Sequence, residues 1–560
     1  MSSDCDQSWR IPTLLIIATA FISQILSAGL GSLFNETDGQ YAGAARAMVE
    51  NGSWLIPENN GSPRLVKPPG LYWLIASAMK IFGVNEFAAR LPGALATAAM
   101  ALLAALITRH SGSWKQAATS AAIFSSMLGS FTLCRIVMPE PTFSLLIAAS
   151  LWAFLRSTSA EPPARPLLII AFWLFAGLAS FIKGPHGILF PLLIAGISSF
   201  LLPGASLRQL FSPMGIILAL AINIPWHLIV ENRFPGYLSN LLLSEYLGHV
   251  AGSQTPATSY TNVPRITFIL LHLAWFFPWS MLVIAAFPRM FRQVPPPSQW
   301  NPATRLSIVW MLVIGSAVLL AGQRQDYYAM SLWPAFAVAS SALLEKTLPK
   351  LGILTALALL LISLLACLTA GWLLPSTPTG ETSRRATAIL TVLSLGTHTW
   401  RQLTTIAILA LIPAICLLTI AALRKKFALP ATFAASLCIG AGAVCGTSIV
   451  SPLFSLKDVA PLVLKNAEKI IFDGDLDTAS SLLFYAPVPI YLVDILPPFA
   501  ANPSNYITRQ DAIRMLATSP HTILITESAR ASLWQNSSPT PLTHLATCGT
   551  MTLLGQPPSR

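Results

Sequence analysis

Repeated apolar runs of about 20 residues dominate the sequence, and they constrain its fold more than any other feature. In a lipid bilayer such a run forms a helix, because lipid offers backbone groups no hydrogen-bond partner. Only 10% of the residues are charged, whereas soluble domains carry roughly 25%. The sequence therefore predicts an α-helical polytopic membrane protein with about thirteen spans. These lie near residues 11–32, 88–108, 116–134, 138–156, 166–183, 187–203, 212–230, 266–287, 305–322, 327–344, 351–374, 403–423 and 428–450.

The placement of Lys and Arg predicts the orientation of the chain. The net charge is +12, but a nucleic-acid binder needs a solvated, charge-dense face, so no nucleic-acid partner is expected. If the N-terminus is inside, the inner loops carry mainly cations, for example Arg109, Lys115 and residues 424–426, while the outer loops mix cations with acids. This asymmetry favours a cytoplasmic N-terminus. An odd number of spans then places the C-terminus outside.

The composition changes at about residue 455, and the rest of the chain resembles a small globular domain. Residues 470–474, 489–494 and 522–527 have the length and β-branched content of buried strands. Helix-like stretches separate them at 477–485 and 509–518. We therefore expect a transmembrane domain over residues 1–454 and a small α/β domain outside the membrane over residues 455–560.

The first outer segment, residues 35–87, is too long for a simple turn. Its parts NETDGQYAGAARAMVENGSW and LYWLIASAMKIFG have apolar residues at helical spacing. This pattern predicts two helices that lie along the membrane surface. The alternative is a loop whose apolar residues merely touch the helical bundle.

Three carboxylates stand where a membrane protein rarely places them. Glu36 and Asp38 follow the first span at its outer end, and Glu140 begins the fourth span between two prolines. A half-buried carboxylate has the raised proton affinity of a general base. In the alternative interpretation, Glu36 and Asp38 are solvated interface residues, with Asp38 capping a helix, and Glu140 pairs with Arg135.

Cations from distant segments recur at the same outer level. One alone would be an interface residue with its charge in water, but several together suit a phosphate group. They are Arg64, Lys67, Lys183, Arg265 and Arg324. An enzyme that acts on a lipid-linked phosphate fits this placement better than a transporter or flippase, which would carry polar residues at mid-span.

Several segments resemble the bacterial relatives of the protein O-mannosyltransferases, a group that includes the aminoarabinose transferase of lipid A. The resemblance begins with ETDGQYAGAARAMVENGSWLIPENNGSPRLVKPPGLYWL and continues through RIVMPEPTFSLL, FIKGPHGILFPLL, IPWHLIVENRFPGYLSNLLLSEYLGH and RQDYYAMSLWPAFAV. It covers most of residues 35–340 in order.

The resemblance implies a GT-C fold in a bacterial inner membrane, with the C-terminal domain in the periplasm. It also implies transfer of a sugar, with inversion, from a polyprenyl-phosphate-linked donor to a hydroxyl of lipid A, a protein or another glycoconjugate. An acid of the first outer loop would be the base. The family's Asp-Glu pair is not reproduced here, so Asp38 and Glu36 both stay candidates, with Asp38 preferred. Glu140 matches the family's second acid.

The resemblance also assigns donor-binding residues. Lys67 matches the Lys of the family's Lys-Pro motif and would hold the donor phosphate, with Tyr72 or Tyr328 beside it. By charge and membrane level, Arg64, Arg265 and Arg324 are further candidates for binding this phosphate. Residues expected to line the substrate pocket are Tyr41, Tyr72, Lys183, Tyr327 and Tyr328. In the lipid A transferases an acid precedes this Lys and is a candidate metal ligand, but Val66 stands here. Dependence on a divalent metal ion is left open.

Overall fold

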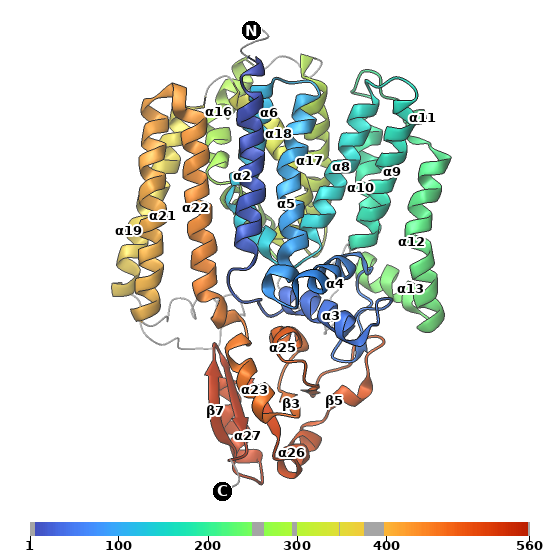
Figure 1. The fold of residues 1–560 in the computed structure, drawn as a ribbon, viewed down its shortest axis with the longest axis vertical. Helices are drawn as coiled ribbons and strands as arrows, with labels where there is room; N and C mark the ends of the chain where they lie inside the picture. The colour runs from blue at the N-terminus through green and yellow to red at the C-terminus, as the bar shows by residue number, and fades with distance from the viewer. Residues whose placement is uncertain (1–5, 249–261, 294–298, 346–347, 374–396, 558–560) are drawn as a thin grey trace.

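A bundle of long helices forms the upper part of the molecule, and a small sheet-containing domain lies below it (Figure 1). The computed structural model describes residues 6–248, 262–293, 299–345, 348–373 and 397–557. The bundle contains α2 (Arg10–Ala28), α5 (Glu86–Arg109), α6 (Trp114–Ser126), α7 (Leu128–Thr132), α8 (Glu140–Ser157), α9 (Ala164–Lys183), α10 (His186–Ser198), α12 (Pro213–Arg233), α15 (Arg265–Trp275), α16 (Trp279–Gln293), α17 (Pro302–Leu320), α18 (Trp333–Leu344), α19 (Lys350–Leu373), α21 (Thr397–Leu423) and α22 (Ala428–Val450).

The chain is a multi-pass membrane protein, as predicted, although the number of thirteen spans is not confirmed. Within the described ranges, nine helices are long and apolar enough to cross a membrane, or eleven if two bent helix pairs each count as one span. Helices α8 and α10 stand where two further spans were predicted. With 13 residues, α10 reaches about 20 Å, which is shorter than the hydrocarbon core.

Small residues let bundle helices pack closely where the site is built. A Cβ added to Gly177 of α9 would lie 2.8 Å from the Cα atom of Ala219 in α12. Contact of this kind between helix backbones is typical of membrane bundles, in which packing rather than the hydrophobic effect drives association. Helices α9 and α12 are thereby held together along one side of the first outer segment.

The first outer segment contains two helices, so the alternative of a simple loop is wrong. They are α3 (Thr37–Asn51) and α4 (Gly70–Phe82), joined by the short strands β1 (Glu58–Asn59) and β2 (Ser62–Pro63). Helix α3 ends at Gly52, whose φ of 69° suits glycine. Unlike a helix that floats on a membrane surface, α3 is buried from Asp38 to Ala45, because the C-terminal domain covers its outer side.

The C-terminal domain is built on a six-stranded sheet with the strand order β5-β4-β3-β6-β8-β7. Strands β3 to β6 run parallel, and the pairings of β6 with β8 and of β8 with β7 are antiparallel. The elements are α23 (Ala460–Asn466), β3 (Lys469–Phe472), α24 (Leu476–Ala479), α25 (Ser481–Tyr485), β4 (Ile490–Val493), β5 (Tyr506–Ile507), α26 (Arg509–Thr518), β6 (Thr522–Glu527), α27 (Ala531–Ser537), β7 (Thr543–Cys548) and β8 (Met551–Gly555). The three predicted strands are confirmed. Strands β5, β7 and β8 were not predicted; β5 has only two residues and β7 is an edge strand with three exposed residues, whereas β8 is mostly buried.

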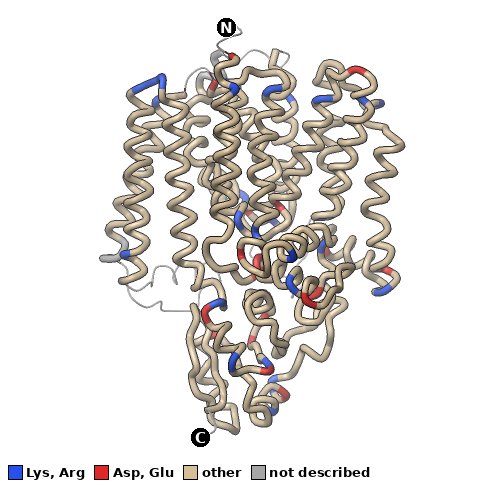
Figure 2. Tube along the Cα trace, in the orientation of Figure 1, with Lys and Arg blue, Asp and Glu red and all other residues tan. Residues whose placement is uncertain are grey.

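Charged residues separate along the long axis of the molecule. Figure 2 shows mainly Lys and Arg at the upper end of the bundle, and mixed acids and bases at its lower end and in the domain below. The first described residues and the C-terminal domain lie at opposite ends. The mixed zone at the lower end contains α3, α4 and the predicted site residues.

Candidate functional site

Asp38 is held at the start of α3 by contacts with two other segments. Its side chain is 1% exposed. Oδ2 accepts a hydrogen bond from the Phe34 N–H at 3.0 Å, and Oδ1 accepts one from the Val137 N–H at 2.5 Å. The Arg90 guanidinium of α5 lies 3.7 Å from Oδ2. Asp38 therefore links the first outer segment to the turn that leads into α8 and Glu140.

Burial dominates the electrostatics of Asp38. Removal from water raises the pKa of its carboxyl above the ordinary value of 3.8. The charge on Arg90, the two backbone N–H donors and Arg135 act in the opposite direction, but their combined effect is smaller. A carboxylate with raised proton affinity is better suited to accept a proton from a substrate than a solvated one.

A polar cavity of about 190 Å³ adjoins Asp38. Arg90 donates to the carbonyls of Leu30, Gly31 and Ser32, and Arg135 donates to that of Leu30. The Nε–H groups of both arginines are buried, and neither has a hydrogen-bond partner in the described part of the chain. The cavity therefore offers both a carboxylate and positive charge to an entering group. Its lining consists of Leu30, Gly31, Ser32, Phe34, Asp38, Arg90, Thr132, Leu133, Arg135, Ile136, Thr447, Ser448 and Ser451.

A second charged cluster surrounds Glu140, the first residue of α8. Glu140 is 4% exposed, and its Oε1 lies 3.0 Å from the Lys183 ammonium at the end of α9. Among the described residues, Oε2 of Glu140 has no hydrogen-bond partner. The Lys183 ammonium also lies 4.9 Å from the ring centre of Tyr328. The alternative pairing of Glu140 with Arg135 does not occur, because Arg135 bonds to the end of α2 instead.

Lys67 belongs to this second cluster through a residue that sequence reasoning missed. Its ammonium lies 3.7 Å from a carboxylate oxygen of Glu245, in the π-helix Leu241–Leu247. Burial lowers the pKa of Lys67 below its ordinary value of 10.5, and the nearby charges of Lys183 and Arg64 add to this, while Glu245 and Glu140 oppose it. An additional anion beside the Lys67 ammonium would stabilise its charged form.

Arg64 connects the second cluster to the two outer helices. Its Nε–H donates to the Tyr72 hydroxyl at 2.9 Å, and its guanidinium lies 5.4 Å from the ring centre of Tyr41. The two tyrosine rings stack with their centres 5.1 Å apart. Burial raises the pKa of Tyr72, so its hydroxyl stays protonated. The structure thus brings Arg64, Tyr41 and Tyr72 together.

The side chains of Arg265 and Arg324 bond to backbone carbonyl groups. Arg324 donates to the carbonyls of Val318, Val263, Leu319 and Ala321, and Arg265 Nε donates to that of Leu319 at 3.0 Å. These contacts satisfy carbonyl groups that the end of α17 leaves without helical partners. The sequence indicated the membrane level of both residues but not the direction of their side chains. Tyr327 packs edge-on against Tyr328, with ring centres 5.3 Å apart.

The backbone of Glu36 bonds to the C-terminal domain. Its φ of 68° lies in the left-handed region that residues other than glycine seldom adopt. Its N–H donates to the Asp477 carbonyl at 2.7 Å, and its own carbonyl accepts from the Ser480 hydroxyl at 3.1 Å. Glu36 is therefore fixed by the C-terminal domain, two residues before Asp38.

An apolar cavity of about 640 Å³ lies between α4, α8, α9 and α12. It adjoins the second cluster along the chain, because Gly70 follows Lys67 by three residues and Thr142 follows Glu140 by two. Its other lining residues, none of them charged, are Leu55, Trp73, Leu74, Leu146, Leu178, Phe181, Ile182, Ile222, Pro225, Trp226 and Ile229. The charged groups thus neighbour a space suited to a hydrocarbon chain.

The described residues include no group of three or more His, Cys, Asp or Glu side chains that could hold a metal ion. Val66 occupies the position at which the resemblance expects an acid. The residues present at this site therefore do not fit a metal centre.

The fold and the site define a GT-C-type membrane protein, with buried carboxylates and cations at the lower end of its bundle in Figure 1. Residues 66–229 match the family model of dolichyl-phosphate-mannose-protein mannosyltransferase. The chain is thus similar to the protein O-mannosyltransferases and to their ArnT-like bacterial relatives.

Two curated relatives are undecaprenyl phosphate-alpha-4-amino-4-deoxy-L-arabinose arabinosyl transferases. That of Pseudomonas savastanoi is 25% identical over 338 residues, 59% of this chain and 61% of the relative. That of Pseudomonas fluorescens is 26% identical over 347 residues, 61% of this chain and 57% of the relative. The matches thus span roughly three fifths of each relative.

The structure is similar to the crystal structure of ArnT from Cupriavidus metallidurans bound to undecaprenyl phosphate. The TM-score is 0.80 at 18% sequence identity, over 98% of both chains. The apo structure of the same protein gives the same TM-score over 97% of both chains. This similarity supports the GT-C fold for the whole chain, including the C-terminal domain.

Proposed function

We propose that this protein is a glycosyltransferase of the bacterial inner membrane that moves a sugar from a polyprenyl-phosphate-linked donor to an acceptor at the outer membrane face. The observation that carries the proposal is the cluster of Lys67 and Lys183 next to the apolar cavity. A polyprenyl phosphate has the same two parts, an anionic head and a hydrocarbon chain. The relatives named above act on undecaprenyl-phosphate-linked aminoarabinose, which makes that donor the first candidate.

The donor phosphate would bind to lysines that are paired with carboxylates in this structure. Lys67 faces Glu245, and Lys183 faces Glu140. A donor phosphate beside Lys67 would relieve the cost of burying its ammonium next to Lys183 and Arg64. Cations at this point would also stabilise the negative charge on the phosphate as it leaves. The apolar cavity would hold the first isoprene units of the donor.

The transfer needs a group that takes the acceptor's proton, and Asp38 is our candidate. The oxygen–hydrogen bond of the acceptor hydroxyl would break as its proton passes to Asp38. The acceptor oxygen would bond to the anomeric carbon while the bond from that carbon to the phosphate oxygen breaks, with inversion. Arg90 and Arg135 line the adjoining cavity, which favours an acceptor that carries negative charge, such as lipid A, over a neutral one.

Glu36 and Glu140 are weaker candidates for the base. Glu140 is engaged with Lys183 at 3.0 Å, which favours a role in holding the donor side of the site. The flippase alternative gains no support, because the relatives reported above are transferases. The charged clusters also lie at one end of the bundle.

The test is transfer by the purified protein in lipid nanodiscs. The protein would be given undecaprenyl phosphate-linked aminoarabinose and lipid A, and the lipids would be analysed by mass spectrometry. We expect lipid A to gain the mass of one sugar and undecaprenyl phosphate to appear in equal amount. Unchanged donor together with unmodified lipid A would refute the proposal. Asp38→Asn protein is the control for uncatalysed transfer.

A further inference from the structure

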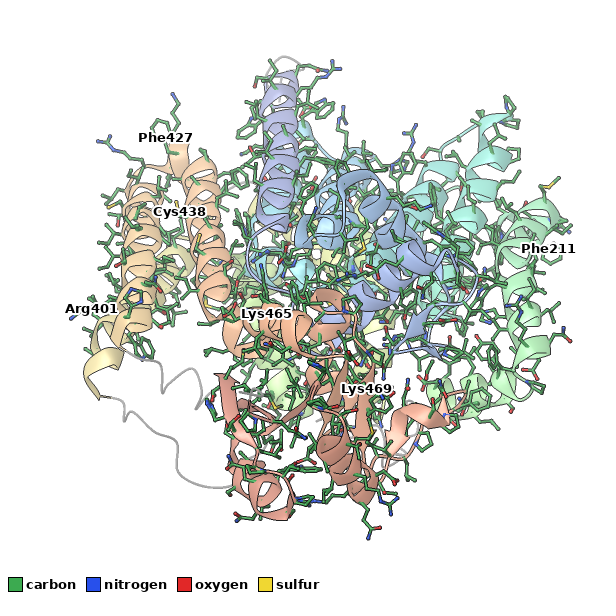
Figure 3. The ribbon with its side chains drawn as sticks, turned by 60° about the horizontal axis from the view of Figure 1, so that its bottom comes forward. Phe211, Arg401, Phe427, Cys438, Lys465 and Lys469 are labelled. Atoms are coloured by element: carbon green, nitrogen blue, oxygen red, sulfur yellow. The ribbon has the colours of Figure 1, made fainter. Side chains whose placement is uncertain are left out.

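The C-terminal domain contacts the segment that carries Asp38. The Gln40 amide donates to the Asp477 carboxylate, and the Ser480 hydroxyl donates to the Glu36 carbonyl at 3.1 Å. Figure 3, in which the lower end comes forward, shows this domain side by side with the helices of the first outer segment. The contacts join residues more than 430 positions apart in the sequence.

Further bonds fix the residues that precede Glu36. The Asn35 N–H donates to the Phe454 carbonyl at 2.8 Å, and the Asn35 side chain accepts from the Ser481 N–H at 3.1 Å. The Leu33 N–H donates to the Tyr485 hydroxyl at 2.7 Å. Backbone or side-chain atoms of four residues between positions 33 and 40 thus bond to the last part of the chain.

The tyrosine is itself anchored to the membrane bundle. Its hydroxyl donates to a carboxylate oxygen of Glu86 at 3.1 Å, and the Lys457 ammonium lies 2.6 Å from the same oxygen. Glu86 begins α5, the helix that also carries Arg90. Tyr485 therefore joins Leu33, three residues before Glu36, to the start of α5.

The conformation of Glu36 makes these bonds consequential. A φ of 68° with a ψ of −114° is unfavourable for a residue with a Cβ atom. Such a conformation persists only where surrounding structure holds it. Here both the N–H and the carbonyl of Glu36 bond to the C-terminal domain. This bend turns the chain so that Asp38 meets the Val137 N–H inside the bundle.

Two glycines bring the backbones of α3 and α25 into direct contact. A Cβ on Gly39 would lie 2.3 Å from the Ser480 carbonyl carbon, and a Cβ on Gly43 would lie 2.5 Å from the Leu483 Cβ. Residues four apart share one helix face, so this face of α3 is shaped for α25. Because glycine has no side chain that could change its rotamer, a shift of α25 would act directly on the backbone of α3.

We propose that the C-terminal domain positions the catalytic carboxylate, with Asp477, Ser480 and Tyr485 as its positioning residues. They hold residues 33–40 in the bent conformation that directs Asp38 towards Val137 and Arg90. They do not contact the donor or the acceptor. This proposal rests on the proposed function, because it assigns Asp38 a place in the transfer reaction.

The test compares Asp477→Ala with Asp477→Asn, since asparagine keeps the oxygen that accepts from Gln40. We expect Asp477→Ala to lower kcat about 10- to 100-fold, the effect of a small misplacement of a catalytic group. The donor KM should change less than about twofold, because Lys67 lies in the other cluster. Asp477→Asn should retain most of kcat. Equal losses in both variants would overturn the proposal, since the oxygen would then not be what matters.

Hydrogen–deuterium exchange separates this proposal from the proposed function. Amides of residues 33–41 should exchange faster in Asp477→Ala and Tyr485→Phe protein than in wild type. Tyr491→Phe, in β4 of the same domain, is the matched control and should leave that exchange unchanged. Unchanged exchange in both test variants would overturn the positioning role. Absence of sugar transfer by wild-type protein would refute the proposed function, and the exchange data would still decide on positioning.

Discussion

The Asp38 carboxylate combines burial with capacity to accept a proton. Each of its oxygens accepts one backbone N–H, and a carboxylate oxygen has two acceptor sites. One site on each oxygen is therefore left for another group. Arg90 and Arg135 lie close enough to favour the charged form, while burial disfavours it. This balance gives a carboxylate that binds a proton more readily than a solvated aspartate.

Asp38→Asn should abolish turnover while donor binding persists. The loss of a general base lowers kcat by roughly 10²- to 10⁴-fold, and the asparagine amide cannot take the acceptor's proton. Glu36→Gln is the matched control, because it removes a carboxylate two residues away and should cost much less. The measurements are kcat and the donor Kd for both proteins. If Glu36→Gln caused the larger loss in kcat, Glu36 rather than Asp38 would be the base.

Lys67→Ala should weaken donor binding, and the pH dependence should identify the charge responsible. A hydrogen bond to a charged group contributes about 1.5–3 kcal/mol, so the donor Kd should rise roughly 10- to 100-fold. Burial lowers the pKa of Lys67, so its ammonium is lost at a lower pH than that of a solvated lysine. Wild-type donor affinity should therefore fall as the pH rises towards 10.5, the ordinary value. Titration calorimetry would detect this, and the same fall in Lys67→Ala protein would exclude Lys67 as its cause.

The sequence predicted which residues belong to the site better than it predicted which residues they contact. Lys67 and Glu140 were found because their motifs and membrane level are local properties. Glu245 was missed because its pairing with Lys67 depends on how distant segments fold together. Arg265 and Arg324 were assigned to the donor phosphate by charge and membrane level, which did not reveal that their side chains bond to carbonyls near the end of α17.

At the scale of elements, four helices shape the space proposed for the donor lipid. Helices α4, α8, α9 and α12 line the apolar cavity, and close contact between Gly177 and Ala219 fixes two of them. The sequence predicted these helices, because each is an apolar run. It could not predict the cavity, since a cavity depends on the angles at which the helices pack.

Filling the cavity should weaken binding of a long-chain donor. Ile222→Trp on α12 adds volume to the cavity lining, and overfilling a packed site costs about 1–3 kcal/mol. The donor Kd should rise about 10-fold for an undecaprenyl chain and less for a water-soluble analogue with a short prenyl chain. Ile217→Trp is the matched control, because this residue lies on the same helix and is 61% exposed. Equal effects of both substitutions would remove the cavity from donor binding.

Helix α3 illustrates why burial was misjudged from the sequence. Its small and apolar residues predicted an amphipathic surface helix, and the helix itself is confirmed. Its polar residue Gln40 does not face water, however, because it is buried and bonds to Asp477 of the C-terminal domain. Contacts between the two ends of a chain leave no periodic pattern in either segment.

At the scale of the whole molecule, the two charged ends predict how the protein lies in the membrane. The upper end carries mainly Lys and Arg, and the C-terminal domain lies at the other end. In a variant without its native cysteines, a cysteine at Arg514 should react with a membrane-impermeant maleimide in intact spheroplasts, because Arg514 is exposed in that domain. A cysteine at Lys425 should react only after lysis. The reverse pattern would place the C-terminal domain in the cytoplasm.

The bond between Ser480 and Glu36 also has a consequence for biosynthesis. The two residues are 444 positions apart, so the ribosome makes the bend before Asp38 long before its support exists. Until the C-terminal domain has folded against this segment, Glu36 lacks the two bonds to Asp477 and Ser480 that help to hold its unfavourable φ. A chain that has not yet reached residue 480 would therefore have the helices of its apolar cavity in place but Asp38 poorly directed. Activity would then begin only after this part of the C-terminal domain has been made.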